Sequence, residues 1–269
     1  MLVWASMESL QLFLKGRKIG AAALLALIIN IKLIPLAVLA LYIYKGAFKT
    51  STFTILFVLL ALLLPGIVIG FGFNTMLLND WYQSLTQTNS NSIMEDYGRQ
   101  SLSSFIPAML MDTPIQFNIK RNIANLSPQT VNYILNLARL LLLIIVTYLL
   151  GKPFRQSKNK KEILYAFALV GLCTPLFFPH QGKYAFFYLL PAYTFVFDAI
   201  THKVDKKSKR LNIVLAGVSV LMLSLSTDGL IGRHYSDLCE YLNLLTLGSL
   251  SLLVQLALLK PQHQDFEKA

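Results

Sequence analysis

Long apolar runs without charge are the feature that most limits how this chain can fold. Several stretches of 16–24 residues carry almost no Asp, Glu, Lys or Arg, and about 20 apolar residues suffice to cross the hydrocarbon core of a bilayer. Apolar residues make up 55% of the chain and charged residues 14%, against about 45–50% and about 25% in soluble domains. These runs exclude a soluble globular protein and predict an all-α, polytopic transmembrane helix bundle.

About six full spans are expected within a single membrane domain over residues 1–269, with a broken helical segment near the N-terminus. The predicted spans are 51–73, 129–150, 163–179, 184–201, 211–227 and 241–259. The apolar run 19–44 is interrupted at Lys32–Pro35, because proline removes a backbone donor and disfavours helix in the residue before it. We expect a partly re-entrant hairpin there, with one long kinked span as the alternative.

The formal net charge of +11 is explained by topology. Of the 24 Lys and Arg residues, 17 lie in the five short segments 15–18, 45–49, 152–161, 203–210 and 260–268. Basic residues concentrate in cytoplasmic loops of membrane proteins. The pattern therefore predicts a multi-pass protein of the cell (inner) membrane with a cytoplasmic C-terminus, and it does not indicate a nucleic-acid partner.

The segment 74–128 is the one long loop expected outside the membrane. Apolar residues recur at helical spacing in Met76–Leu85 and in Leu102–Met111, which predicts two interfacial helices along the membrane surface. Structured loops of this length are uncommon unless they have a function. We therefore expect this extracytoplasmic loop to contribute to a site.

A first candidate site lies in this loop, at Arg99, Gln100 and Ser101. Guanidinium, amide and hydroxyl groups can hold a phosphate or the hydroxyls of a sugar by hydrogen bonds. The alternative is an ordinary polar turn that caps a helix starting at Leu102.

A second candidate site is the tight turn that contains His180, Lys183 and Tyr184. At an outer membrane boundary, His180 could carry a proton and Lys183 could bind a phosphate. The alternative is a solvated connecting turn in which Tyr184 belongs to the aromatic belt.

Two charges, Lys32 and Arg139, fall inside apolar segments. Intramembrane charges are costly and mark functional sites by default. For Lys32 the alternative is that its long stem brings the ammonium group to an interface.

The sequence gives little indication of a general base or of a cofactor. Asp80, Glu95, Asp96 and Asp112 are candidate bases, although surface solubility is the stronger explanation for each of them taken singly. The sequence has no paired-histidine metal motif and no glycine-rich phosphate loop, and its two cysteines have no metal-ligand spacing. No metal site and no cofactor are predicted.

Three elements in order resemble a known family. They are Ile28–Pro35 with its Lys-x-x-Pro core, Arg99–Leu102, and the stretch from Phe178 to Ala192. Together with the apolar spans between them, over about residues 10–200, they resemble the polytopic glycosyltransferases of family 87, which are similar to polyprenyl-phosphate-mannose-dependent mannosyltransferases.

The resemblance implies a GT-C type helical fold whose active site faces away from the cytoplasm. It implies an inverting transfer of a hexose, most often mannose, from a polyprenyl-phosphate sugar donor to a lipid or glycan acceptor. Such a transfer needs a base for the acceptor hydroxyl and cations for the departing phosphate. The cations implied are Arg99, Arg139, His180 and Lys183, with His180 as the catalytic candidate.

The chain also departs from the family pattern. Arg99 stands where the family has asparagine, and family members carry their acidic base in a loop near the N-terminus of a longer chain. We therefore expect an N-terminal part to be missing, and no residue here is assigned as that acid. The alternatives are a lipid-linked sugar transporter, an accessory membrane subunit of envelope polysaccharide synthesis, or an inactive truncated fragment.

Overall fold

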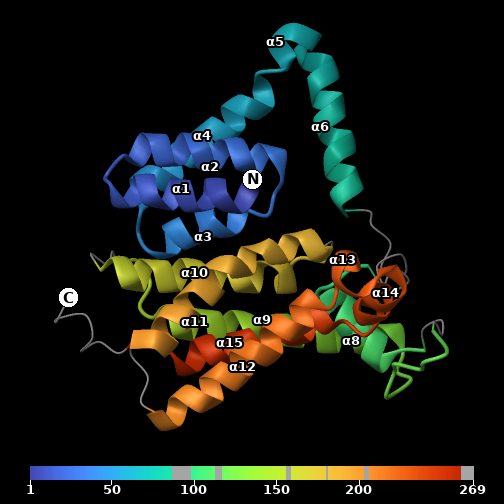
Figure 1. Cartoon of the computed structure of the whole chain (residues 1–269). Helices are drawn as coiled ribbons and strands as arrows, with labels where there is room; N and C mark the ends of the chain where they lie inside the picture. The colour runs from blue at the N-terminus through green and yellow to red at the C-terminus, as the bar shows by residue number, and fades with distance from the viewer. Residues whose placement is uncertain (87–97, 113–116, 156–158, 180, 203–205, 262–269) are drawn as a thin grey trace. The chain divides into compact units, whose positions relative to one another are not determined.

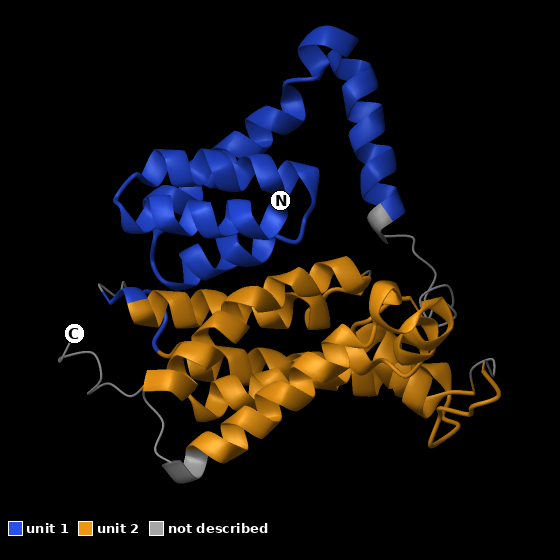
Figure 2. Cartoon of the chain, viewed as in Figure 1, with its two compact units in different colours: residues 1–89, 152–160 blue, residues 90–151, 161–269 orange. Residues whose placement is uncertain are grey.

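A computed structural model describes residues 1–86, 98–112, 117–155, 159–179, 181–202 and 206–261 (Figure 1). These residues form helices joined by turns, and no β-strand occurs among them, as the apolar runs predict. The chain divides into two compact units, residues 1–89 with 152–160 (unit 1) and residues 90–151 with 161–269 (unit 2), coloured separately in Figure 2. The single membrane domain over the whole chain stays a prediction.

Unit 1 is a set of helices connected by short turns. They are α1 (Leu2–Leu14), α2 (Lys18–Ile31), α3 (Leu36–Tyr44), α4 (Phe48–Leu63), α5 (Gly66–Ile69) and α6 (Phe71–Thr86). α1 and α2 pack closely together. Ala21 and Ala22 of α2 are fully buried, and their small side chains permit this close approach. The Ser9 hydroxyl donates to the Ala21 carbonyl at 2.9 Å, an interhelical hydrogen bond of the kind that holds apolar helices together.

The helical run near the N-terminus breaks between Ile31 and Leu36. Lys32 has extended backbone angles, φ −156° and ψ 137°, and α3 starts directly after Pro35. Proline is tolerated at this place because the first amides of a helix have no intrahelical partner. Whether the broken segment re-enters the membrane or crosses it stays a prediction.

Unit 2 contains the longer helices and most of the candidate site residues. Its helices are α8 (Leu102–Leu110), α9 (Pro128–Leu150), α10 (Lys160–Phe177), the 3₁₀ helix η1 (Lys183–Leu189), α11 (Leu190–His202), α12 (Lys206–Ser224), α13 (Asp228–Ile231), α14 (Arg233–Tyr241) and α15 (Leu244–Leu258). α12 and α15 pack along each other, and α11 contacts both. α8 packs on α9, and η1 packs on α15.

Two glycines of unit 2 stand where its elements come closest. A Cβ on Gly171 of α10 would lie 2.8 Å from the carbonyl oxygen of Tyr188 in η1. A Cβ on Gly248 of α15 would overlap the side chain of Leu223 on α12. Across the same interface, the Ser219 hydroxyl donates to the Gly248 carbonyl at 2.7 Å. Small residues at these points therefore set the spacing of the bundle.

Three helical segments of the described chain are long and apolar enough to cross a membrane: Phe48–Ile69, Pro128–Leu150 and Lys183–His202. A fourth counts if α14 and α15, bent by 59° at their junction, form one crossing. These segments overlap the crossings predicted at 51–73, 129–150, 184–201 and 241–259. Their lengths and apolar compositions are typical of the helices of a membrane protein.

The predicted spans 163–179 and 211–227 correspond to α10 and α12, which are not among those segments. α10 begins with Lys160, Lys161 and Glu162, and α12 begins within the basic stretch 206–210. Charges in the first turn shorten the apolar part of each helix, so the count of six full spans stays a prediction. The interfacial placement of the helices within 74–128, which the structure has as α6 and α8, stays one as well.

Candidate active site

Ser101 is the N-terminal cap of helix α8 and directly follows Gln100 in the chain. The Ser101 hydroxyl accepts a hydrogen bond from the Ser103 amide at 3.2 Å, and the Ser101 amide donates to the Ser104 hydroxyl at 3.0 Å. This reciprocal capping arrangement satisfies amides that would otherwise lack a partner at the helix start. The helix-capping alternative for this segment is therefore correct as far as Ser101 is concerned.

Gln100 connects three parts of unit 2. Its backbone amide donates to the Gln181 carbonyl at 2.7 Å, and its side-chain amide donates to the Glu240 carbonyl at 2.7 Å. The side chain of Gln100 is fully buried. The loop motif at 99–102 thus meets both the turn after α10 and the end of α14, two segments that lie about 80 and 140 residues away in the sequence.

Arg139 of α9 reaches the start of α8. Its Nη2 donates to the Ser103 hydroxyl at 2.6 Å, while Asn136 lies at 3.4 Å from Nη1. The guanidinium is half-buried, and its Nε has no hydrogen-bond partner among the described residues. No carboxylate pairs with Arg139 in the described part of the chain. The described residues therefore leave the charge of Arg139 without a counter-ion.

Lys183 lies in a different electrostatic setting. Its ammonium nitrogen is 2.9 Å from Oδ1 of Asp228 and 3.1 Å from Oε1 of Glu240. Asp228 Oδ1 also accepts from the Ser236 hydroxyl at 2.8 Å. The hydrogen bond from Lys183, and after it the one from Ser236, lowers the pKa of the Asp228 carboxyl below its ordinary value. One ammonium group therefore faces two carboxyl groups and has no surplus positive charge.

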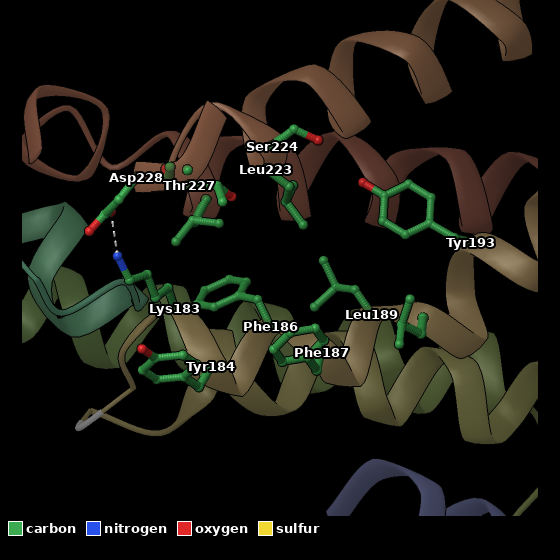
Figure 3. Close-up of a pocket in the computed structure, with 14 residues that line it drawn as sticks. Lys183, Tyr184, Phe186, Phe187, Leu189, Tyr193, Leu223, Ser224, Thr227 and Asp228 are labelled. Atoms are coloured by element: carbon green, nitrogen blue, oxygen red, sulfur yellow. Dashed lines mark hydrogen bonds and ion pairs between the residues drawn. The ribbon is translucent and has the colours of Figure 1, made fainter. Parts of the chain in front are cut away.

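A cavity of about 550 Å³ opens beside this ion-pair cluster. Figure 3 shows Lys183, Tyr184 and Asp228 at one end of the cavity, aromatic and aliphatic side chains along its length, and Tyr193 at the other end. The walls come from η1, the start of α11, the end of α12 and the start of α13. A volume of this size is within the range of small-molecule sites, about 300–1,000 Å³.

The segment after α8 is hydrogen-bonded to the C-terminal end of α14. Arg121 donates from Nη1 to the Tyr241 carbonyl at 2.8 Å, and its guanidinium stacks over the Tyr241 ring at 4.3 Å. The Tyr241 hydroxyl in turn donates to the Ile119 carbonyl at 2.8 Å. Tyr241 is almost completely buried. The end of α14 that carries Glu240 is thereby held from two directions.

The structure brings some predicted site residues together and separates others. Gln100, Ser101 and Arg139 share the start of α8, and Lys183 and Tyr184 share the cavity mouth, where Tyr184 is 75% exposed. The outcome differs for three other predicted residues. The Arg99 carbonyl accepts from Ser104 at 2.7 Å, Lys32 is exposed at the end of α2 in unit 1, and His180 lies outside the described residues.

The two acids that pair with Lys183 were missed by sequence reasoning. Asp228 and Glu240 bracket a short polar segment between α12 and α15, and that polar interruption of apolar sequence was the available signal. Of the acids named as candidate bases, Asp80 and Asp112 are exposed, and Glu95 and Asp96 lie outside the described residues. In the part of the chain that the structure describes, no group of three His, Cys, Asp or Glu side chains is placed to hold a metal ion.

The fold and the buried polar junction define a helical membrane protein with candidate binding groups at one end of unit 2. The model of glycosyltransferase family 87 matches residues 2–179, which is more than half of the chain. The protein belongs to glycosyltransferase family 87, as the ordered motifs indicate. Neither the curated proteins nor the solved structures with which the chain was compared include a match to it.

Proposed function

We propose that the protein transfers a hexose, most often mannose, from a polyprenyl-phosphate sugar to a lipid or glycan acceptor on the extracytoplasmic side of the cell membrane. In this proposal the fold is of the GT-C type with six full spans and a cytoplasmic C-terminus, and the reaction is inverting. Membership of glycosyltransferase family 87 supports the class of reaction. The donor, the acceptor and the sidedness belong to the proposal.

The observation that carries the proposal is the junction at Gln100. Three segments that resemble family motifs or flank them meet there through hydrogen bonds of 2.7 Å to Gln181 and to Glu240. A buried side chain that holds distant segments together makes a rigid support for reacting groups, and rigid positioning is a main source of catalytic rate. The junction therefore supports a site built from 99–102, the turn after α10 and α14.

Arg139 supplies the cation that the departing phosphate requires. Transfer of the sugar breaks the bond between its anomeric carbon and the phosphate oxygen, so negative charge develops on the phosphate. A guanidinium presents several donors in one plane, which suits phosphate oxygens. Within the described residues Arg139 has no carboxylate partner and its Nε has no acceptor, whereas Lys183 is already opposed by two carboxyl groups. We therefore assign the phosphate to Arg139 in preference to Lys183.

The proposal is tested by transfer of radiolabelled mannose from polyprenyl-phosphate mannose in membrane vesicles that contain the full chain. Arg139→Ala should lower the rate by about 10²–10³-fold, the loss seen when one charge-stabilising donor is removed. Arg139→Lys should restore part of the rate because it keeps the charge. Arg17→Ala is the matched control, because Arg17 is exposed and lies in unit 1, outside the proposed site.

Two results would contradict the proposal. Equal rates for Arg139→Ala and the parent, at equal amounts in the membrane, would remove Arg139 from the site. Movement of the intact labelled donor across the vesicle membrane, without transfer of its sugar to any acceptor, would favour the transporter alternative.

A further inference from the structure

The cavity beside Lys183 has a polar end and an apolar body. At the mouth lie Lys183, Tyr184 and Asp228, as Figure 3 shows. The body is lined by apolar side chains from η1, α11, α12 and α15. Phe186 and Leu189 are almost fully buried, whereas Phe187 and Leu190 are more than half exposed. A binding site with this division accepts a molecule that has one polar end and one hydrocarbon chain.

A buried hydroxyl of the cavity lining lacks a partner among the described residues. Ser226 lines the cavity, is 2% exposed, and its Oγ makes no hydrogen bond to any described residue. A buried hydroxyl without a partner is costly, and native proteins leave few of them. A ligand group that donates to or accepts from the Ser226 hydroxyl would remove this cost.

The charged groups at the mouth determine which kind of polar head a ligand can place there. The Lys183 ammonium is within 2.9 Å of Asp228 and 3.1 Å of Glu240, and the Glu240 side chain is only 9% exposed. A phosphate or carboxylate head would meet the outer carboxylate, Asp228, and no surplus positive charge. An uncharged head with several hydroxyl groups would instead donate hydrogen bonds to Asp228 and accept them from Lys183 and Ser226.

We infer that this cavity binds an amphiphile with an uncharged, hydroxyl-rich head and a single hydrocarbon chain, with the head at Asp228 and the chain among the aromatic side chains of η1. The inference rests on the proposed function for the role of that ligand, which is the acceptor: the site takes a glycolipid and not a soluble glycan. The acceptor hydroxyls and the donor phosphate then have separate groups, Asp228 and Arg139. Selection works because two carboxyl groups face Lys183, the positive charge among the described residues that line the acceptor end.

Photolabelling in phosphatidylcholine vesicles tests the inference on the full chain. Two probes share a dodecyl chain with a terminal diazirine and differ in their heads, one a maltoside and the other a phosphate. The maltoside probe should label peptides that contain 183–193 and 223–229 in a saturable manner. Excess unlabelled dodecyl maltoside should compete about fivefold better than dodecyl phosphate, the ratio expected for one exposed charge contact.

Variants separate the head contact from the chain contact. Asp228→Lys should reverse the preference between the two heads, while Asp198→Lys, the same charge change at an exposed position of α11 outside the cavity lining, should leave it unchanged. Leu190→Trp places a larger ring at the cavity wall and should abolish saturable labelling. Leu221→Trp is its control, because Leu221 is exposed on α12 and does not line the cavity.

Each outcome decides a different statement. Saturable labelling with the phosphate probe preferred would overturn the assignment of the head, and labelling of the cavity peptides without saturation would overturn the cavity as a site. Binding of a maltoside requires no donor and no reaction. Loss of labelling therefore refutes this inference alone, whereas absence of mannose transfer with labelling intact refutes the proposed function alone.

Discussion

The side-chain amide of Gln100 donates to the backbone carbonyl of Glu240 at 2.7 Å, across 140 residues of sequence. Because the Gln100 side chain is fully buried, this bond is shielded from water and holds the loop at 99–102 against the end of α14. The same end of α14 places the Glu240 carboxyl beside Lys183. The position of one amide therefore sets the geometry of both halves of the candidate site.

Gln100→Ala should destabilise the protein. The substitution removes one of the two hydrogen bonds to the Glu240 carbonyl, which also accepts from the Asn243 amide at 2.9 Å. One hydrogen bond contributes about 0.5–1.5 kcal/mol net. Thermal unfolding of the purified chain in detergent measures the change. Gln129→Ala, at an exposed position in the first turn of α9, is the matched control. A loss for Gln100→Ala no larger than that for Gln129→Ala would show that the junction does not bear on stability.

Arg139 and Ser103 should be energetically coupled. Their hydrogen bond of 2.6 Å joins a charged donor to a buried acceptor, and a double-mutant cycle of Arg139→Ala and Ser103→Ala should give a coupling of about 1 kcal/mol or more. The free energy of unfolding is the quantity to measure. The corresponding cycle of Arg139 with Asn136→Ala should give a coupling near zero, because that contact is exposed and 3.4 Å long. Equal coupling energies in the two cycles would contradict the prediction that the bond from Arg139 to Ser103 is the stronger of the two contacts.

Adding a methyl group should have opposite effects at two glycines of unit 2. Gly171→Ala brings a Cβ to 2.8 Å from a backbone carbonyl oxygen, and overpacking of this kind costs about 1–3 kcal/mol. Gly217→Ala on α12 meets nothing within 4 Å and should stabilise the helix by up to about 1 kcal/mol through propensity. Melting temperatures of the two variants are compared with that of the parent. The packing at η1 would be in doubt if Gly171→Ala were as stable as Gly217→Ala.

The contact between Lys183 and Asp228 should be lost in acid. The pKa of Asp228 is lowered in the folded protein, so the carboxylate adds stability at pH values above its ordinary pKa of 3.8. That contribution falls away as the pH drops through the lowered value. Unfolding of the parent and of Asp228→Asn, followed from pH 7 to pH 3, should differ at neutral pH and converge in acid. Asp237→Asn serves as the control, and a constant difference between the parent and Asp228→Asn at every pH would contradict the prediction.

Most helices of the fold could be predicted from local sequence. Pro35 accounts for the break between α2 and α3, and Ser101 accounts for the start of α8. The bend between α14 and α15 was not predicted. It occurs at Asn243, whose φ of +55° lies in the left-handed region, and no short-range pattern of apolar residues signals such a conformation.

The candidate site was predicted in part. Gln100, Ser101 and Arg139 were selected by residue type and position, and the structure joins them around α8. Lys183 was selected as a phosphate-binding group, a role that stays a prediction, and the structure adds two carboxyl groups beside it. Those groups come from a segment about 45–57 residues further along the chain. Sequence separation of that size carries no information about contact.

The sequence by itself determined that this protein is built of apolar helices, because a chain in lipid must satisfy its backbone hydrogen bonds internally. It also determined the family, through motifs whose order can be read along the chain. Only the tertiary structure decided which of the described charges have a counter-ion and which do not. Arg139 is without a carboxylate partner in the described chain while Lys183 has two, since electrostatic pairing depends on distances of a few ångströms between groups that are remote in sequence.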